Sequence, residues 1–170
     1  MSGDDCIAVK SGWDEYGIRF NMPSQHIVVR RLTCISPTSA MIALGSEMSG
    51  GIRDVRAEDI TAIGTESAVR IKTAVGRGAY VRDVYARRMR LDGMKRVFWM
   101  TGDYKSHPDD GYDKTAVPVV ENISCQYVVA TGVWTLEGGG ADAGHLHGQR
   151  HCRDDQGEEV CRGTMQTSRA

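Results

Sequence analysis

Two stretches of the chain, DVRAEDI at residues 54–60 and DVYARRM at residues 83–89, carry one repeated pattern that decides the fold. The first could be read alone as an amphipathic helix, but the second repeats its pattern and glycines bracket both. HIVVRRL at residues 26–32 and NISCQYV at residues 122–128 share the pattern. Four copies of a short segment rich in β-branched residues, separated by turn residues, favour an all-β fold.

The copies recur at nearly constant spacing. Their equivalent positions are separated by 28, 29 and 39 residues. These positions are Ile27, Val55, Val84 and Ile123. A second strand follows in three of the units, within MIALG, AVRIK and RVFWM, and its equivalent positions are separated by 27 and 29 residues. These positions are Leu44, Ile71 and Met100.

A period in the high twenties, with two or more short strands per unit, predicts a solenoid whose coils stack in parallel. The polar segment at residues 101–118 absorbs the longer third spacing as a loop that leaves the coil. A β-sandwich is the alternative all-β architecture, but it would not repeat one coil along the chain.

The composition limits the class of protein. The chain has 170 residues, of which 41% are hydrophobic and 25% charged, as in an ordinary globular domain. Lys and Arg number 21 against 22 Asp and Glu, so the basic excess of nucleic-acid-binding proteins is missing. No apolar run approaches the roughly 20 residues that span a bilayer, and the N-terminus lacks a signal-peptide pattern. We therefore expect no nucleic-acid or membrane partner. We also expect the folded chain to be a monomer.

Side-chain alternation puts two cations on one face of a predicted strand. In AVRIKT at residues 68–73, Val69 and Ile71 share one parity and belong in the core. Arg70 and Lys72 have the opposite parity and therefore point outward together. Because Arg offers a bidentate grip to carboxylates, the pair is a candidate site for an anionic ligand. The alternative is a solvated strand face whose charges oppose aggregation.

Two adjacent carboxylates, Asp4 and Asp5, precede the first predicted strand, within SGDDCIAVKSGW at residues 2–13. Aspartate is a favoured turn residue, so the pair alone is compatible with a solvated turn. Close carboxylates can also have separated pKa values, one acting as an acid and the other as a base. Stacked coils would bring the pair to the same face as Arg70 and Lys72, an arrangement that suits hydrolysis of an acidic sugar polymer.

Three motifs and the coil period resemble the polygalacturonases, which are pectin-cleaving glycoside hydrolases. The motifs are GDDC (residues 3–6), IALGSEMSGG (residues 42–51) and RIKT (residues 70–73). The resemblance extends over residues 2–131 and is greatest to plant-type members. It implies a right-handed, single-stranded parallel β-helix, here a partial solenoid over residues 1–138. It also implies hydrolysis of α-1,4-galacturonosyl bonds in pectin, without metal or organic cofactor, at an extracellular location in the cell wall.

The resemblance assigns roles to the two carboxylates. The first Asp of the family's pair is the general acid, which corresponds to Asp4. The second, Asp5, helps to activate water, as in inverting glycosidases whose carboxyl groups lie roughly 6.5–9.5 Å apart. The resemblance also implies a disulfide between Cys6 and Cys34, near these carboxylates.

The resemblance further assigns substrate binding. The family's RIK motif binds substrate carboxylates, which corresponds to Arg70 and Lys72. A tyrosine downstream of that motif lines the family's cleft, and TGDYKSH at residues 101–107 aligns Tyr104 with it. Lys10 could contribute a further cation.

The sequence departs from the family pattern in two places. A third catalytic Asp, in an NTD motif one coil before the Asp-Asp pair, is not present. Ala40, within Ser39-Ala40-Met41, stands where the family's GHG motif has a histidine. We therefore expect an internal fragment that lacks upstream coils and a signal peptide. The alternative functions are a non-catalytic pectin-binding β-helix remnant and a pseudogene product.

Residues 139–170 have a different character and form a predicted tail. One interpretation is disorder, because large apolar residues are few after Gly144. A metal site formed by His145, His147, His151 and Cys152 is a second interpretation, although His/Cys tracts also arise without one. A third is a changed reading frame, since GHLHGQRHCRDDQGEE shifted by one nucleotide can read DTFTGNVTAEMTKAKK, which resembles the family's next coil. On that hypothesis the tail carries no function.

Overall fold

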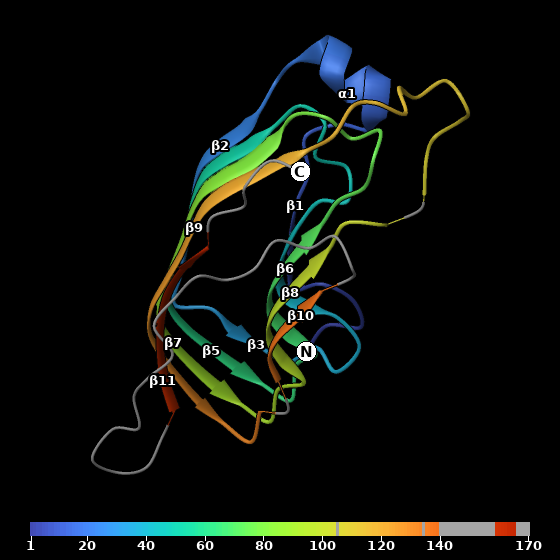
Figure 1. Cartoon of the computed structure of the whole chain (residues 1–170). Helices are drawn as coiled ribbons and strands as arrows, with labels where there is room; N and C mark the ends of the chain where they lie inside the picture. Colours follow the sequence, from blue (N-terminus) through green and yellow to red (C-terminus); the bar gives the residue numbers. More distant parts are fainter. Residues whose placement is uncertain (105, 134, 140–158, 166–170) are drawn as a thin grey trace.

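The chain passes back and forth between two facing sheets, so that each coil contributes to both sheets (Figure 1). The computed structural model describes residues 1–104, 106–133, 135–139 and 159–165. Over residues 1–139, every strand pair within the two sheets is parallel. The chain is therefore a parallel β-helix, which confirms the predicted solenoid.

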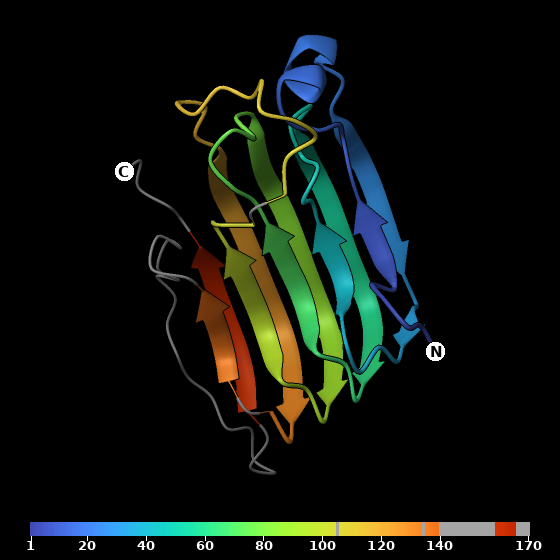
Figure 2. The same cartoon turned by 90° about the vertical axis from the view of Figure 1, so that its right-hand side faces the viewer.

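One sheet consists of short strands that lie side by side in the order in which they occur (Figure 2). Its members are β1 (Ile7–Val9), β4 (Ala40–Leu44), β6 (Ser67–Lys72), β8 (Arg96–Thr101) and β10 (Thr135–Gly139). Leu44 pairs with Ile71, and Ile71 pairs with Met100. The register read from the sequence repeat is thus confirmed in this sheet.

The second sheet is built mainly from longer strands. Its members are β2 (Ser24–Arg30), β5 (Ile52–Ile63), β7 (Tyr80–Asp92), β9 (Val119–Thr131) and β11 (Glu159–Met165), and β3 (Thr33–Cys34) pairs with β5. The predicted equivalent residues are partners in successive pairs, from Ile27 through Val55 and Val84 to Ile123. This register depends on the pattern of buried side chains in each coil and on a nearly constant coil length, and both can be read from the sequence.

Strand β11 differs from the other strands, because it pairs with β9 in the antiparallel direction. It belongs to the segment at residues 139–170 that we predicted to be a tail, and it extends the sheet beyond β9 (Figure 1). The changed reading frame stays a prediction. The candidate metal ligands His145, His147, His151 and Cys152 lie outside the described residues.

Single residues in the left-handed region bend the long strands at equivalent points in each coil. The first set, with φ between +51° and +58°, is His26, Asp54, Asp83 and Asn122. The second set, with φ between +53° and +56°, is Arg31, Asp59, Arg88 and Tyr127. Asp and Asn visit this conformation more readily than most residues, which suits them to the first bend. Each bend redirects the strand around the core.

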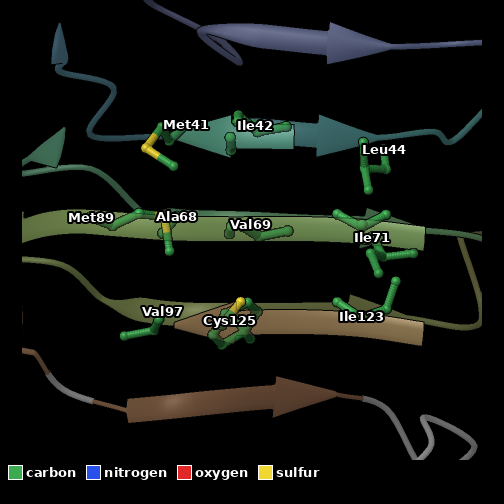
Figure 3. Packing of buried hydrophobic residues seen from close by; sticks show 14 of the residues in the cluster. Met41, Ile42, Leu44, Ala68, Val69, Ile71, Met89, Val97, Ile123 and Cys125 are labelled. Atoms are coloured by element: carbon green, nitrogen blue, oxygen red, sulfur yellow. The ribbon is translucent and has the colours of Figure 1, made fainter. Parts of the chain in front are cut away.

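The core lies between the two sheets (Figure 3). Ile42 and Leu44 of β4 and Val69 and Ile71 of β6 are all buried, as their parity predicted. Burial of a branched aliphatic side chain contributes about 1.5–3 kcal/mol, so these stacked columns supply much of the stability of the helix.

The irregular segments lie along one edge of the stacked coils (Figure 2). The helix α1 (Asp14–Phe20) occurs between β1 and β2 and was not predicted. The polar segment between β8 and β9 leaves the coil beside α1, as the longer third spacing predicted. Among the described residues, no helix has the length and apolar character needed to cross a membrane.

Candidate active site

The two cations predicted on β6 lie on the outer face of the short-strand sheet, yet they are largely shielded from solvent. The side chain of Lys72 is 9% exposed and that of Arg70 is 13% exposed. Their neighbours Val69 and Ile71 are buried on the opposite face. A solvated strand face would leave both cations free in water, so the structure does not favour that alternative.

Lys72 forms an ion pair with Asp5, a residue that lies two coils earlier, just before β1. The ammonium Nζ lies 2.7 Å from Asp5 Oδ2. Ser39 Oγ donates to Asp5 Oδ1 at 2.5 Å, and the backbone N–H of Ala40 donates to the same oxygen at 3.1 Å. Burial raises the pKa of the Asp5 carboxyl, but the bonds from Lys72, Ser39 and Ala40 outweigh it and hold that pKa below the ordinary value for Asp. Asp5 is therefore a carboxylate held in its ionised form.

The neighbouring Asp4 has a different environment. Its residue is exposed, and its Oδ1 accepts a hydrogen bond of 2.7 Å from the backbone N–H of Asp5. Within the described part of the chain, no Lys or Arg forms an ion pair with Asp4. Two adjacent carboxylates with unlike surroundings are a common basis for dividing acid and base roles.

Arg70 is held by an aromatic ring. Its guanidinium carbon lies 3.7 Å from the ring centroid of Trp99, and that of Arg96 lies 4.3 Å from the same ring. The nearest carboxylate, that of Glu66, is 4.0 Å away, and Arg70 Nε is buried without a hydrogen-bond partner among the described residues. The Nη groups of Arg70 form no hydrogen bond with the described residues, so these groups retain donor capacity for a ligand.

Trp99 was not predicted as a site residue. The alignment of AVRIK with RVFWM nevertheless contains the signal, because Arg70 and Trp99 occupy equivalent positions in that repeat. The two residues are register partners in β6 and β8. Adjacent coils thus place an aromatic ring beside a cation.

Tyr104, which the family resemblance assigned to the cleft, lies next to both cations. Its ring centroid is 5.9 Å from the guanidinium carbon of Arg70 and 5.8 Å from Lys72 Nζ. Its backbone N–H donates to the carbonyl of Thr73 at 3.0 Å, which attaches the start of the loop to the end of β6. The structure therefore brings together Asp5, Arg70, Lys72 and Tyr104.

Lys10 has a different partner. It forms an ion pair with Glu47, and its side chain is 50% exposed. None of the contacts among the described residues joins Lys10 to Asp5, Arg70, Lys72 or Tyr104. Sequence reasoning missed Glu47, because a partner 37 residues away depends on coil stacking.

The surroundings of the carboxylates contain the disulfide that the family resemblance implied. Cys6 and Cys34 are bonded, which links the start of β1 to β3. Ala40, where the family has a histidine, is fully buried at the start of β4. Its side chain offers no polar group to the site, and only its backbone N–H reaches Asp5. In the described part of the chain, no group of three or more metal-ligating side chains could hold a metal ion.

Comparison with known proteins identifies the family. The model for glycosyl hydrolases family 28 matches residues 1–145. The chain belongs to this family. A probable polygalacturonase from Vitis vinifera is 63% identical over 133 residues, which are 78% of this chain and 27% of that relative. The chain thus spans about a quarter of the length of this relative.

A solved structure was also found to be similar. The crystal structure of a hyperthermoactive exopolygalacturonase from Thermotoga maritima matches with 25% identity and a TM-score of 0.46, over 79% of this chain and 39% of that one. The predicted family resemblance is confirmed by the family match and the plant relative.

Proposed function

We propose that the chain contributes to hydrolysis of α-1,4-galacturonosyl bonds in pectin or polygalacturonate. The observation that carries this proposal is the pairing of unlike carboxylates with cations: exposed Asp4, ionised Asp5, and Lys72 in contact with Asp5. A hydrolase for an acidic polymer needs an acid, a base and positive charge near the same bond. Membership of family 28 supports the reaction class.

In the proposed reaction, Asp4 donates its proton to the glycosidic oxygen as the bond to the anomeric carbon breaks. A water molecule attacks that carbon from the opposite face, and Asp5 accepts the water's proton. One proton is thus given and one taken, and the configuration at the anomeric carbon inverts. The lowered pKa of Asp5 keeps its carboxylate ionised, as a proton acceptor must be, and Asp4 is exposed to the solvent side from which a substrate would approach.

The cations bind the substrate carboxylates. Arg70, stacked on Trp99, presents guanidinium donors, and the ring of Tyr104 lies within 6 Å of both cationic groups. Lys72 has three N–H donors and gives one to Asp5, so it can also reach a galacturonate carboxylate. Lys10 would extend the positive charge only when a substrate displaces Glu47. We further propose that the protein acts outside the cell, in the cell wall, as a monomer.

A non-catalytic pectin-binding β-helix is the second candidate. The arrangement around Asp5 favours it, because Ser39, Ala40 and Lys72 already use three of the roughly four acceptor positions of this carboxylate. A carboxylate so well hydrogen-bonded is a weak base. In that case the cations Arg70 and Lys72 would bind the polymer without cleaving it.

The two candidates differ in product release. The test incubates the chain with polygalacturonate and measures new reducing ends together with binding. A hydrolase releases reducing ends, and Asp4→Asn lowers the rate by about two orders of magnitude or more while binding persists. Asp110→Asn is the matched control, since Asp110 is an exposed member of a second Asp-Asp pair. Binding without release, equal in both variants, would select the non-catalytic candidate.

A further inference from the structure

A buried ion cluster lies outside the candidate active site and joins three segments of the chain. Arg77, in the connection between β6 and β7, has no solvent exposure. It forms an ion pair with the equally buried Asp14, the first residue of α1. Asp14 Oδ2 also lies 2.6 Å from Nδ1 of His107, which belongs to the loop between β8 and β9. The cluster therefore ties α1 and the loop to the coil that carries the cations.

Arg77 also bonds directly to the backbone of this loop. Its Nη2 donates to the carbonyl of Ser106 at 2.6 Å and lies 3.4 Å from the carbonyl of Tyr104. The N–H of Tyr104 donates to Thr73. Both peptide groups of Tyr104 are thus attached to the segment that follows β6. The position of a tyrosine ring relative to its backbone is set by χ1, which has three staggered wells, while χ2 only turns the ring about its own axis; a fixed backbone therefore restricts the ring to a few positions.

A ring stack supports the same loop from the other side. The rings of His107 and Tyr112 are stacked, with centroids 3.6 Å apart and planes 2° from parallel. They cover Gly76, whose φ is +95°, and a Cβ added there would lie 2.5 Å from Tyr112 Cδ2. Glycine is thus required beneath the stack, one residue before Arg77. The loop therefore packs closely on the segment that follows β6.

The cost of such a cluster argues for a specific role. A buried ion pair is often no more stabilising than apolar residues of the same size, because both charges lose their hydration. Here the charges do something that apolar residues cannot: Arg77 supplies donors to two loop carbonyls and to Asp14 at once. Directional bonds from a fixed cation determine the loop's position, whereas apolar contact would allow it to slide.

We propose that Arg77 is a positioning residue that fixes Tyr104 beside Arg70 and Lys72 for binding of the acidic polysaccharide. This inference rests on the proposed function, since Tyr104 matters to ligand only if the cationic face binds one. Arg77 does not touch the substrate itself. It acts through the backbone of Tyr104, and Asp14 acts by holding the guanidinium of Arg77 in place.

The test compares Arg77→Lys with Arg90→Lys, a control at an exposed arginine of β7. Lysine keeps the charge but cannot bond to Asp14 and two carbonyls with one planar group. Two quantities are measured: amide hydrogen exchange at Tyr104, relative to amides of β5 and β7, and the Kd for polygalacturonate. We expect Arg77→Lys to speed exchange at Tyr104 by about tenfold or more. We expect its Kd to rise about tenfold, and Arg90→Lys to change neither quantity.

A second variant covers the case in which Arg77→Lys does not fold. Asp14→Asn keeps an acceptor oxygen but removes the charge that holds Arg77, and Asn tolerates the φ of +45° at this position. Asp14→Asn should also speed amide exchange at Tyr104 and raise the Kd for polygalacturonate, each by less than Arg77→Lys does.

The outcomes separate the inference from the proposed function. Unchanged exchange at Tyr104 in both variants would overturn the positioning role, whatever the binding result. Faster exchange at Tyr104 with an unchanged Kd would also overturn it, because the position of Tyr104 would then not matter to the ligand. A wild-type chain with normal exchange that binds no polygalacturonate would instead overturn the proposed function and, with it, the role in substrate binding.

Discussion

Replacing Lys72 with Met tests the ion pair at the centre of the candidate site. The two side chains of the pair, Lys72 and Asp5, are 9% and 10% exposed, and Nζ lies 2.7 Å from Oδ2. Removing one partner of a buried pair costs about 3–5 kcal/mol, because the other charge stays buried without it. Asp5 keeps its bonds from Ser39 and Ala40, so we expect a loss near the lower end, about 3 kcal/mol at neutral pH.

The loss should depend on pH in a defined direction. Since the pKa of Asp5 is lowered by folding, its carboxylate stabilises the fold above the pKa that Asp has in the unfolded chain. That contribution disappears as the pH falls through the lower, folded-state pKa. Lys72→Met removes a main cause of the lowering while burial still raises the pKa. The difference in stability between wild type and variant should therefore be largest near neutral pH and shrink in acid.

The assay is urea unfolding followed by tryptophan fluorescence, at about pH 7 and about pH 3. Lys10→Met is the matched control, because Lys10 pairs with Glu47 while its side chain is 50% exposed. An exposed pair of this kind contributes less than about 1 kcal/mol. Equal losses in the two variants, or a loss for Lys72→Met that is the same at both pH values, would refute the reasoning about Asp5.

Three further predictions concern packing, the disulfide and the aromatic ring. Val84→Ala should lower the free energy of unfolding by about 2 kcal/mol, because Val84 is buried in the repeated column, whereas Val28→Ala, at 54% exposure, should change it by less than about 0.5 kcal/mol. Urea unfolding measures both. The Cys6–Cys34 disulfide joins residues that are 28 positions apart, and its reduction should lower the free energy of unfolding by about 3 kcal/mol in the same assay. An unchanged urea midpoint would contradict this. Trp99→Leu should weaken polygalacturonate binding about threefold to tenfold in calorimetry, because the ring orients a cation, and unaltered affinity would exclude that role.

The repeated part of the fold could be predicted from sequence because its register depends on local patterns. Val55 and Val84 recur in phase with the coil, and each copy buries the same side-chain parity. The helix at Asp14–Phe20 could not be predicted in this way. It has only seven residues, and its first residue has a φ of +45°, so its position depends on contacts with Arg77 and the distant loop rather than on helical periodicity.

The candidate site was predicted in part for a similar reason. Parity and motif resemblance identified Arg70, Lys72 and Asp5 as residues of one face, and the structure brings Lys72 and Asp5 into direct contact. Their sequence separation of 67 residues concealed that contact. The partners of Arg77 lie 63 residues away at Asp14 and in a loop whose path no periodic pattern records. Such ion pairs arise only when the coils stack.

The most direct test of the account is the affinity of the full chain for polygalacturonate, compared with its affinity for the fully methyl-esterified polymer. Esterification removes the charge that Arg70 and Lys72 are proposed to recognise and leaves the sugar backbone intact. We predict at least about tenfold tighter binding of the acidic polymer, a preference lost in Arg70→Gln and retained in Arg90→Gln, since Arg90 lies on the other sheet. Equal binding of the two polymers, or a preference that survives Arg70→Gln, would contradict the account.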